Sequence, residues 1–374
     1  MTKKMYFLSV LAGVILLSTP NCFSDVPQSP ANDESLKIPP IMNQKNNTNI
    51  KNQLEAGSIA NISFSDSLGV KDSDFKILLQ SRTAHLAFTD IIKFNNVWYI
   101  TFRFSDGHLP KNFANIIIYK STDLKVWQME QIFTQEGYDL RDPKFYIHNN
   151  NLYVQFHSTT INPYAAIRND YISMYNASKS IWEKSVMLNK NEDLKSWFWR
   201  ISSINNKLIV GGYYTVNRSL SLFESNDGIN YNKINNFDLP DQPGESTIRM
   251  KDSTIYIFVR DNLKEAKLGI GNLKDITHWE FTTLPMSRIG GPNFVLYKDF
   301  LLLGCRLNAK TVLQKYDLNS KKLTPLGETQ KVKYDSGYPG MYIENNLLYF
   351  TYYTSSEDNE FQINLSIIDL DKVL

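Results

Sequence analysis

The chain has 374 residues, with 40 Lys and Arg against 38 Asp and Glu, and aromatic residues make up 13% of it. This near balance of charge excludes the basic surface that binds nucleic acid, so we expect no nucleic-acid partner. Two cysteines exclude a disulfide framework. The five histidines show no paired ligand spacing, so we expect no metal and no cofactor.

The first 24 residues have the pattern of an export signal. A pair of lysines precedes an apolar run over residues 6–17, and Cys22 and Ser24 are the small residues of a cleavage site. The run is short for a bilayer span, so we expect cleavage after Ser24, export to the periplasm or the medium, and no stable membrane insertion. Lipid attachment at Cys22 is the less favoured alternative.

Residues 25–75 are rich in Pro, Asn, Lys and Ser and show no sustained period. Such a composition predicts a linker or a disordered segment. The remaining residues, 76–374, are many for one domain unless they form a closed repeat architecture.

An internal repeat runs through residues 76–374. Six segments each place an Asn or Asp turn before a short strand-like run: "FNNVWYITFR", "HNNNLYVQFH", "INNKLIVGGY", "KDSTIYIFVR", "YKDFLLLGCR" and "IENNLLYFTYY". A second set of strand–turn–strand segments alternates with them, the last at residues 363–374. Two hairpins per repeat and six repeats predict an all-β fold, a six-bladed β-propeller with four-stranded antiparallel blades.

Polar residues gather where the innermost strands should begin and the next strands end. In a blade these two positions lie at the same edge, opposite the Asn turn, so they should converge on one face around the axis. The second strands end at Arg103, His157, Tyr213, Arg260, Arg306 and Tyr353. Because packing alone would favour apolar residues there, we interpret this face as a ligand site.

Arginine is the most frequent candidate on this face. The set comprises Arg82, Arg103, Arg141, Arg200, Arg260 and Arg306, with Asp90, Asp106, Asp142 and Glu245 as acidic neighbours. Several converging guanidinium groups predict an anionic ligand, because their planar forks bind carboxylates in bidentate fashion. Any single arginine could instead tie two blades together through an ion pair.

In this order the motifs "RTAHLAFTD", "FRFSDGH", "DLRDPKF", "WFWR", "GESTIRM", "GGPNF", "GCR" and "DSGYPGMY" resemble the sialidase (neuraminidase) superfamily. They are most similar to its divergent bacterial exo-alpha-sialidase branch. Sialidases grip the substrate carboxylate with three arginines, and the resemblance assigns this role to Arg82, Arg260 and Arg306. Arg141 or Arg200 can replace Arg82 in the grip. His85, Arg103, Asp90 and Asp142 are further substrate-binding candidates.

The resemblance also implies the catalytic groups. Tyr338 matches the nucleophile, Glu245 the base that activates it, and Asp106 the acid/base, with His108 as the rival for that last role. A phenol suits a substrate whose carboxylate sits on the anomeric carbon, since a carboxylate nucleophile would meet like charge. The phenol titrates near pH 10 and so needs an adjacent base.

We therefore expect a monomeric exported glycosidase that acts on a sialoglycan or another acidic-sugar glycan. Two alternatives stay open. One is a furanosidase-type propeller that uses Asp90, Asp142 and Glu245, although those folds close with five blades. The other is a glycan-binding propeller without turnover.

Overall fold

A computed structural model describes residues 38–45, 47–56, 68–70, 73–161, 167–189, 196–214, 218–332, 334–356 and 360–374. The expected export signal, residues 1–24, lies outside these ranges. Among the residues described, the helices α1 (Thr48–Lys51) and α2 (Leu370–Val373) have four residues each, and no helix is long and apolar enough to cross a membrane.

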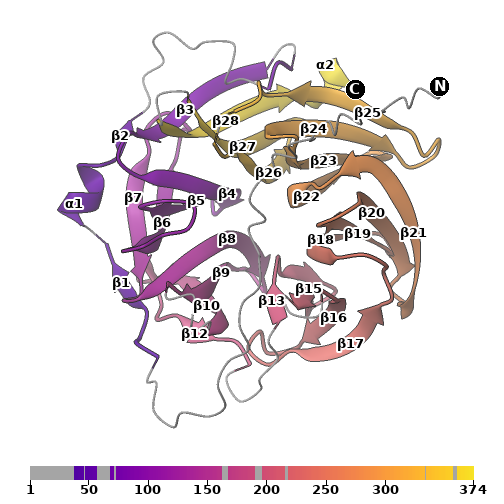
Figure 1. The fold of residues 1–374 in the computed structure, drawn as a ribbon, viewed down its shortest axis with the longest axis horizontal. Helices are drawn as coiled ribbons and strands as arrows, with labels where there is room; N and C mark the ends of the chain where they lie inside the picture. The colour runs from indigo at the N-terminus through magenta and orange to yellow at the C-terminus, as the bar shows by residue number, and fades with distance from the viewer. Residues whose placement is uncertain are drawn as a thin grey trace, which may run out of the picture.

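The described chain is mostly β-strand with very little helix, which confirms the predicted all-β class, and its sheets stand around a central axis (Figure 1). Hydrogen bonding divides the strands into five sheets. The largest sheet contains β1 (Met42–Gln44), β4 (His85–Phe94), β5 (Val97–Ser105), β6 (Ala114–Ser121), β7 (Gln128–Thr134), β8 (Tyr138–His148), β9 (Asn151–Thr160), β10 (Arg168–Asn176), β11 (Ile181–Trp182) and β12 (Val186–Met187). One parallel bridge, between Ala114 and Asp139, joins its two halves, which are the first two predicted repeats.

Each of the other four sheets holds one predicted repeat. The second contains β13 (Ser196–Phe198), β14 (Ser202–Ile204), β15 (Lys207–Tyr214), β16 (Leu220–Ser225) and β17 (Asn232–Phe237). The third contains β18 (Pro243–Lys251), β19 (Thr254–Asp261), β20 (Glu265–Asn272) and β21 (Asp275–Ser287). The fourth contains β22 (Gly290–Tyr297), β23 (Phe300–Leu307), β24 (Lys310–Asp317) and β25 (Leu323–Glu328). The fifth contains β2 (Glu55–Ala56), β3 (Ser73–Ser81), β26 (Gly337–Glu344), β27 (Leu347–Ser355) and β28 (Phe361–Asp369).

The asparagine-rich turns lie where the sequence predicts them, between each innermost strand and its neighbour. Both turn residues have positive φ at 95–96, 149–150, 205–206 and 345–346. Two-residue hairpin turns of this kind match the twist of the flanking strands, and asparagine tolerates the left-handed backbone they require. Because each turn lies at one end of its blade, the start of the innermost strand and the end of the next strand lie together at the opposite end. The candidate site is at that end.

The ring closes with a strand from the N-terminal side of the domain. The sequence predicts a strand–turn–strand hairpin over 363–374, but β28 is one continuous strand and residues 370–373 form α2. The Asp369 side chain accepts the Asp371 N–H and caps this helix, so the chain does not return as a strand. Instead β3 pairs with β28, from Ser73 opposite Ile368 to Ser81 opposite Phe361. The two ends of the fold therefore share one sheet.

The predicted linker over residues 25–75 requires a correction. Its described part contributes β1, which pairs with β7, and β2, which pairs with β3. Ile41, Ile50, Leu68 and Val70 are buried. The domain boundary at residue 76 is therefore wrong, since ordered structure precedes it. The apolar residues of this segment stand singly among Asn and Lys, so the sequence shows no strand or helix periodicity there. They belong to the core because they pack against neighbouring sheets.

Apolar side chains fill the spaces between neighbouring sheets. Tyr256, Phe258, Phe294 and Leu301 form one such layer between the third and fourth sheets. Cys305 is fully buried in the same layer, and burial raises its pKa, so it acts as a packing residue rather than a nucleophile. Dense packing of this kind holds the strand ends in fixed positions around the axis.

Candidate functional site

Four innermost strands share a register shift with a positive-φ residue near their start, and β18 has a register shift between Pro243 and Ser246 without one. In β4, β8, β22 and β26 a register shift leaves two residues of the innermost strand unpaired. The first of the two has a positive φ in each case: Phe88 61°, Asp142 54°, Gly291 60° and Tyr338 48°. This backbone is unusual for bulky residues, and bulges of this kind re-aim a side chain. Asp142 and Tyr338 owe their positions in the site to it.

Tyr338 lies at the centre of a group of hydrogen-bonded side chains. Its hydroxyl donates to Glu245 Oε1 at 3.0 Å and accepts from Arg260 Nη1 at 3.2 Å. Arg260 Nη1 also donates to Glu245 Oε1 at 2.6 Å, and Glu245 Oε2 accepts from the Gly291 N–H at 2.7 Å. A Cβ on Gly291 would lie 2.5 Å from Tyr338 Cα, so only glycine leaves room for the tyrosine. Strands β18, β19, β22 and β26 thus meet at one phenol.

The surroundings of the Tyr338 phenol shift its pKa in opposite directions. Burial raises the pKa of Tyr338 above its ordinary value, and the Glu245 carboxylate adds to the rise. Arg260 and Arg306 act in the other direction, and the Arg306 guanidinium carbon lies 5.1 Å from the centroid of the tyrosine ring. The phenol is therefore protonated at neutral pH and needs a base to become a nucleophile. Glu245 already accepts its hydrogen bond.

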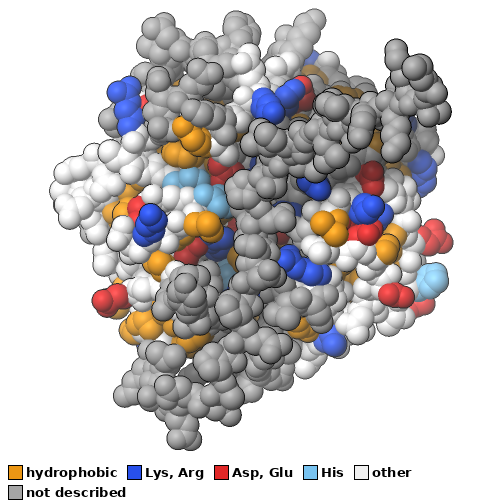
Figure 2. All heavy atoms as spheres, in the orientation of Figure 1, with side chains coloured by type: hydrophobic (Ala, Val, Ile, Leu, Met, Phe, Trp, Pro, Cys, Tyr) orange, Lys and Arg blue, Asp and Glu red, His pale blue; other side chains and the backbone are white. Residues whose placement is uncertain are grey.

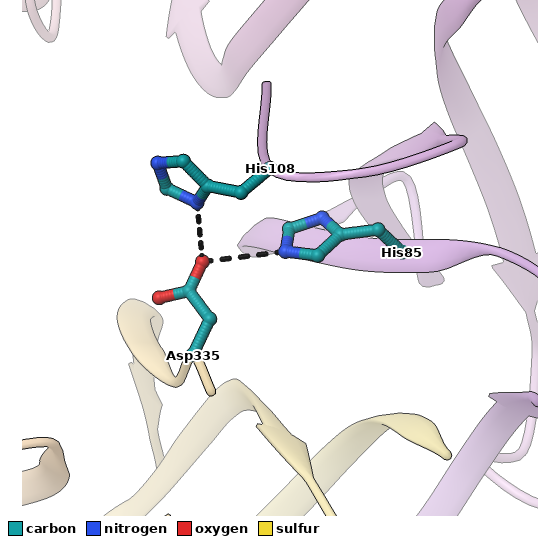
Figure 3. Close-up of side chains that lie close together, drawn as sticks. All are labelled: His85, His108 and Asp335. Carbon is teal, nitrogen blue, oxygen red and sulfur yellow. Dashed lines mark hydrogen bonds and ion pairs between the residues drawn. The ribbon is translucent and has the colours of Figure 1, made fainter. Parts of the chain in front are cut away.

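Asp335 connects this group to two histidines (Figure 3). Its Oδ1 accepts from Arg306 Nη1 at 2.8 Å, while its Oδ2 lies 2.6 Å from His108 Nδ1 and 3.3 Å from His85 Nε2. Burial opposes ionisation of Asp335, but the contacts with His108 and His85 outweigh it and hold the pKa of Asp335 well below its usual range. Burial lowers the pKa of His85. The His108 side chain is 31% exposed, and its second ring nitrogen points away from Asp335.

His85, His108 and Asp335 are also close enough to be considered as metal ligands, since one ligand atom from each lies within 4.8 Å of the others. We interpret them as a hydrogen-bonded network instead. The Arg306 guanidinium already pairs with the carboxylate, and the charge of Arg103 acts on His85. Both positive charges oppose a bound cation, and 2.6 Å is the length of a charge-assisted hydrogen bond.

Asp142 and Lys144 are two further titratable groups in the buried part of the site. Burial raises the pKa of Asp142 to about 6, with Glu245 adding to the rise and Lys144 opposing it. Burial and the charge of Arg200 lower the pKa of Lys144 to about 8, and Asp142 opposes that change. The Lys144 Nζ lies 5.2 Å from the centroid of the Trp199 ring. Both groups therefore change charge within the range of ordinary activity assays.

Arg141 and Arg103 share one carboxylate at the side of the site. Arg141 Nη2 lies 2.6 Å from Asp139 Oδ2, and Arg103 Nε lies 2.9 Å from Asp139 Oδ1. Both arginines also donate to the His108 carbonyl, at 3.1 Å. The Arg103 side chain is fully buried, whereas that of Arg141 is 10% exposed. Arg103 therefore supports the loop that presents His108, and Arg141 is the more accessible of the two.

The structure places two predicted site residues away from the phenol group. The Arg82 side chain is 77% exposed and lies 3.4 Å from Glu360. The exposed Asp106 carboxylate accepts from the Lys111 and Asn112 N–H groups and from Asn112 Nδ2 at 2.7 Å, so it closes its own loop. In both cases a local partner on the surface holds the side chain.

Asp90 and Arg200 form a buried pair further along the axis. Arg200 Nη1 lies 2.9 Å from Asp90 Oδ2, which also accepts from the Phe145 N–H at 2.7 Å. Both side chains are almost fully buried. The pair thus joins β4, β8 and the segment between β13 and β14.

Three residues that the sequence interpretation passed over belong to the site: Asp139, Lys144 and Asp335. Asp335 begins the motif "DSGYPGMY", three residues before Tyr338, and Lys144 follows "RDP" directly. Their positions next to motif residues were the available signal. Figure 2 shows charged and histidine side chains around the middle of the face seen in Figure 1.

Known proteins resemble this chain in structure but not in sequence. No protein-family model and no curated protein sequence matches the chain. A Dyadobacter fermentans protein of unknown function matches 80% of this chain and 99% of its own, with a TM-score of 0.66 and 13% identity. Trypanosoma rangeli sialidase in complex with 2,3-difluorosialic acid, described as a covalent intermediate, has a TM-score of 0.55 at 12% identity, and phage phi92 endosialidase has 0.60 at 11%. The chain therefore has a propeller fold similar to that of sialidases.

The propeller matches only part of these enzymes. The trypanosomal match covers 75% of this chain and 54% of the sialidase, and the phage match covers 80% of this chain and 69% of the endosialidase. The chain therefore spans about half the length of the trypanosomal enzyme. At these identities the likeness establishes the fold alone.

Proposed function

We propose that this propeller has six blades and is an exported glycoside hydrolase that releases a terminal α-linked sialic acid, or a related nonulosonic acid, with retention. The observation that supports it most is the buried phenol of Tyr338 between Glu245 and Arg260. A protein that only binds an anion has no need of a tyrosine hydrogen-bonded to a base. The sialidase-like fold adds independent support.

In the first step Glu245 Oε1 takes the phenolic proton, and the Tyr338 oxygen attacks the anomeric carbon. The bond from that carbon to the glycosidic oxygen breaks, and the leaving oxygen receives a proton from a general acid. Arg260 donates to the phenolic oxygen and stabilises its negative charge. The product is a glycosyl-tyrosine intermediate. Water then attacks it, and Tyr338 leaves and recovers its proton from Glu245, so two inversions give retention.

His108 is the better candidate for the general acid. Asp335 holds the imidazole ring through Nδ1 at 2.6 Å, and the His108 side chain is 31% exposed, so a substrate could reach the ring, which would give a proton to the leaving oxygen and later take one from the attacking water. Asp106 holds its carboxylate on its own loop and would have to give up these hydrogen bonds. The proposed site therefore uses a histidine, kept in position by Asp335, where the sialidase resemblance implies an aspartate.

The substrate carboxylate would be held by Arg260 and Arg306, with Arg141 in place of Arg82 as the third arginine. Arg260 and Arg306 both contact Tyr338, and their side chains are 15% and 26% exposed. Arg141 lies beside the Phe88 ring, 5.7 Å from its centroid, and Phe88 packs on Tyr338 at 4.8 Å. Guanidinium groups at these positions could bind the carboxylate on the carbon that the phenol attacks.

The test is release of free nonulosonic acid from a sialoglycan by the purified chain and by Tyr338→Phe. The wild type should release the sugar, first as the α-anomer by NMR, and the variant should be reduced by at least about 10³-fold. Full activity of Tyr338→Phe would show that Tyr338 is not the nucleophile. Binding of the glycan without release would favour the glycan-binding propeller, and hydrolysis of arabinofuranosides or fructans alone would favour the furanosidase.

A further inference from the structure

A cavity lies on the axis, on the hairpin-turn side of Tyr338. Its volume is about 290 Å³, and its walls come from β4, β8, β14, β18, β22 and β26, so every innermost strand contributes. Met341, which lines it, follows Tyr338 by three residues in β26. At about 3.3 Å per residue the cavity therefore begins about 10 Å along the strand from the phenol. It is a different site from the one assigned to hydrolysis.

Positive charge exceeds negative charge among the polar side chains that line this cavity. Arg200 and Arg249 both face it, with Asp90 as the one carboxylate among its lining residues. Asp90 is already occupied by Arg200 Nη1 and by the Phe145 N–H. The side chain of Arg200 is only 4% exposed, and its Nε is buried without a hydrogen-bond acceptor in the described part of the chain. A buried guanidinium donor without an acceptor is costly and indicates a missing partner.

Arg249 has only neutral partners. Its Nη1 donates to Ser202 Oγ at 3.1 Å and to the Ile248 carbonyl at 3.0 Å, and its Nη2 donates to Asn293 Oδ1 at 3.3 Å. Within the described ranges no carboxylate forms an ion pair with it. Burial and then the charge of Arg200 lower the pKa of Arg249, and Asp90 opposes this only in part. Although its pKa is lowered, the guanidinium is still charged at neutral pH, and it is part-buried without a counterion among the described residues, an arrangement that favours an added anion.

We propose that this axial cavity binds a small oxyanion between Arg200 and Arg249. The shared chemistry is a phosphate-like or carboxylate-like group with two or more acceptor oxygens, because each guanidinium offers a planar fork of donors. A cavity of about 290 Å³ holds such an ion with several waters, since a water occupies about 30 Å³ in the liquid. The ion would join the segment before β14 to β18 across the centre of the ring. This proposal does not depend on the glycosidase assignment.

The experiment measures phosphate and acetate binding to the full chain by calorimetry and by the melting temperature, against sodium chloride at equal ionic strength. We expect saturable binding of at least one of the two ions, with a rise in melting temperature, because the ion binds the folded state alone. Arg249→Gln should weaken binding at least tenfold. Asp90→Asn removes the competing carboxylate, leaves the shape unchanged and should strengthen binding.

Arg306→Gln is the matched control, because Arg306 lies in the phenol site. Binding at the axial cavity should be unchanged in Arg306→Gln. If neither ion binds saturably, or if Arg306→Gln loses binding while Arg249→Gln keeps it, the proposal is overturned. Should Arg249→Gln fail to fold, the comparison of wild type with Asp90→Asn decides, since equal or weaker binding in the aspartate variant contradicts the proposal.

Discussion

Glu245→Gln changes the group to which the phenol, an arginine and a backbone amide all donate. Glu245 Oε1 accepts from Tyr338 and Arg260, and Oε2 accepts from the Gly291 N–H. Glutamine keeps the shape but has one acceptor oxygen, so its NH₂ must face a donor in either orientation. It also leaves the Arg260 guanidinium without its carboxylate in a site where the two side chains are 15% and 9% exposed.

The expected cost of Glu245→Gln follows from these contacts. Removing one partner of a buried ion pair costs about 3–5 kcal/mol in the free energy of unfolding. Loss of the base should lower kcat by about 10²–10⁴-fold, because the phenol remains protonated. The two effects are separate, since kcat is measured on the folded fraction.

Urea unfolding measures the stability of Glu245→Gln, and release of nonulosonic acid measures its activity. Glu360→Gln is the control, because Glu360 pairs with Arg82 at the surface, where one side chain is 77% exposed. That variant should lose at most about 1 kcal/mol and keep its activity. If Glu245→Gln is as stable and as active as the control, the reasoning about the buried base is refuted.

Three further changes have defined outcomes. Burial holds the pKa of Asp142 at about 6, against 3.8 when unperturbed, so its protonated form stabilises the fold below about pH 4. That contribution, at most about 3 kcal/mol, is lost as the pH rises through 6, and urea unfolding should show the loss in the wild type but not in Asp142→Asn. His108→Gln should lower kcat by about 10²–10⁴-fold and remove the limb of the pH–rate profile that belongs to the general acid. Asp106→Asn should change kcat by less than about fivefold. If Asp106→Asn has the larger effect, Asp106 and not His108 is the general acid. Arg306→Lys should raise KM at least about tenfold because lysine lacks the bidentate fork, and Arg82→Lys should leave KM within about twofold, which steady-state kinetics on a sialoside will compare.

Much of the fold could be predicted because the repeat is local. Each Asn turn specifies its own hairpin, and the positive φ values at Asn96, Asn150 and Asn346 match that expectation. The closing strand could not be read in this way. β3 belongs to the last sheet through pairing with β28, almost 300 residues away in sequence, and no local pattern reports such a distant partner.

The candidate site was predictable to the extent that strand ends determine it. Glu245, Arg260 and Tyr338 occupy strand positions, and the ring brings them into contact as expected. Arg82 and Asp106 lie in loops, where a surface partner or a loop N–H can capture a side chain whatever the motif suggests. Their surroundings depend on tertiary contacts that the sequence does not display.

The most direct test of the central claim is whether a sugar becomes attached to Tyr338. The purified chain is incubated with 2,3-difluorosialic acid, from which the C2 fluorine leaves as fluoride when the nucleophile attacks, while the C3 fluorine stays and slows hydrolysis of the glycosyl-enzyme. The intact mass and the peptide masses of the chain are then measured. The account predicts one added fluorosialyl group, located on the peptide that contains Tyr338 and absent in Tyr338→Phe. A group attached to another residue, or no adduct from a chain that hydrolyses sialosides, would contradict it.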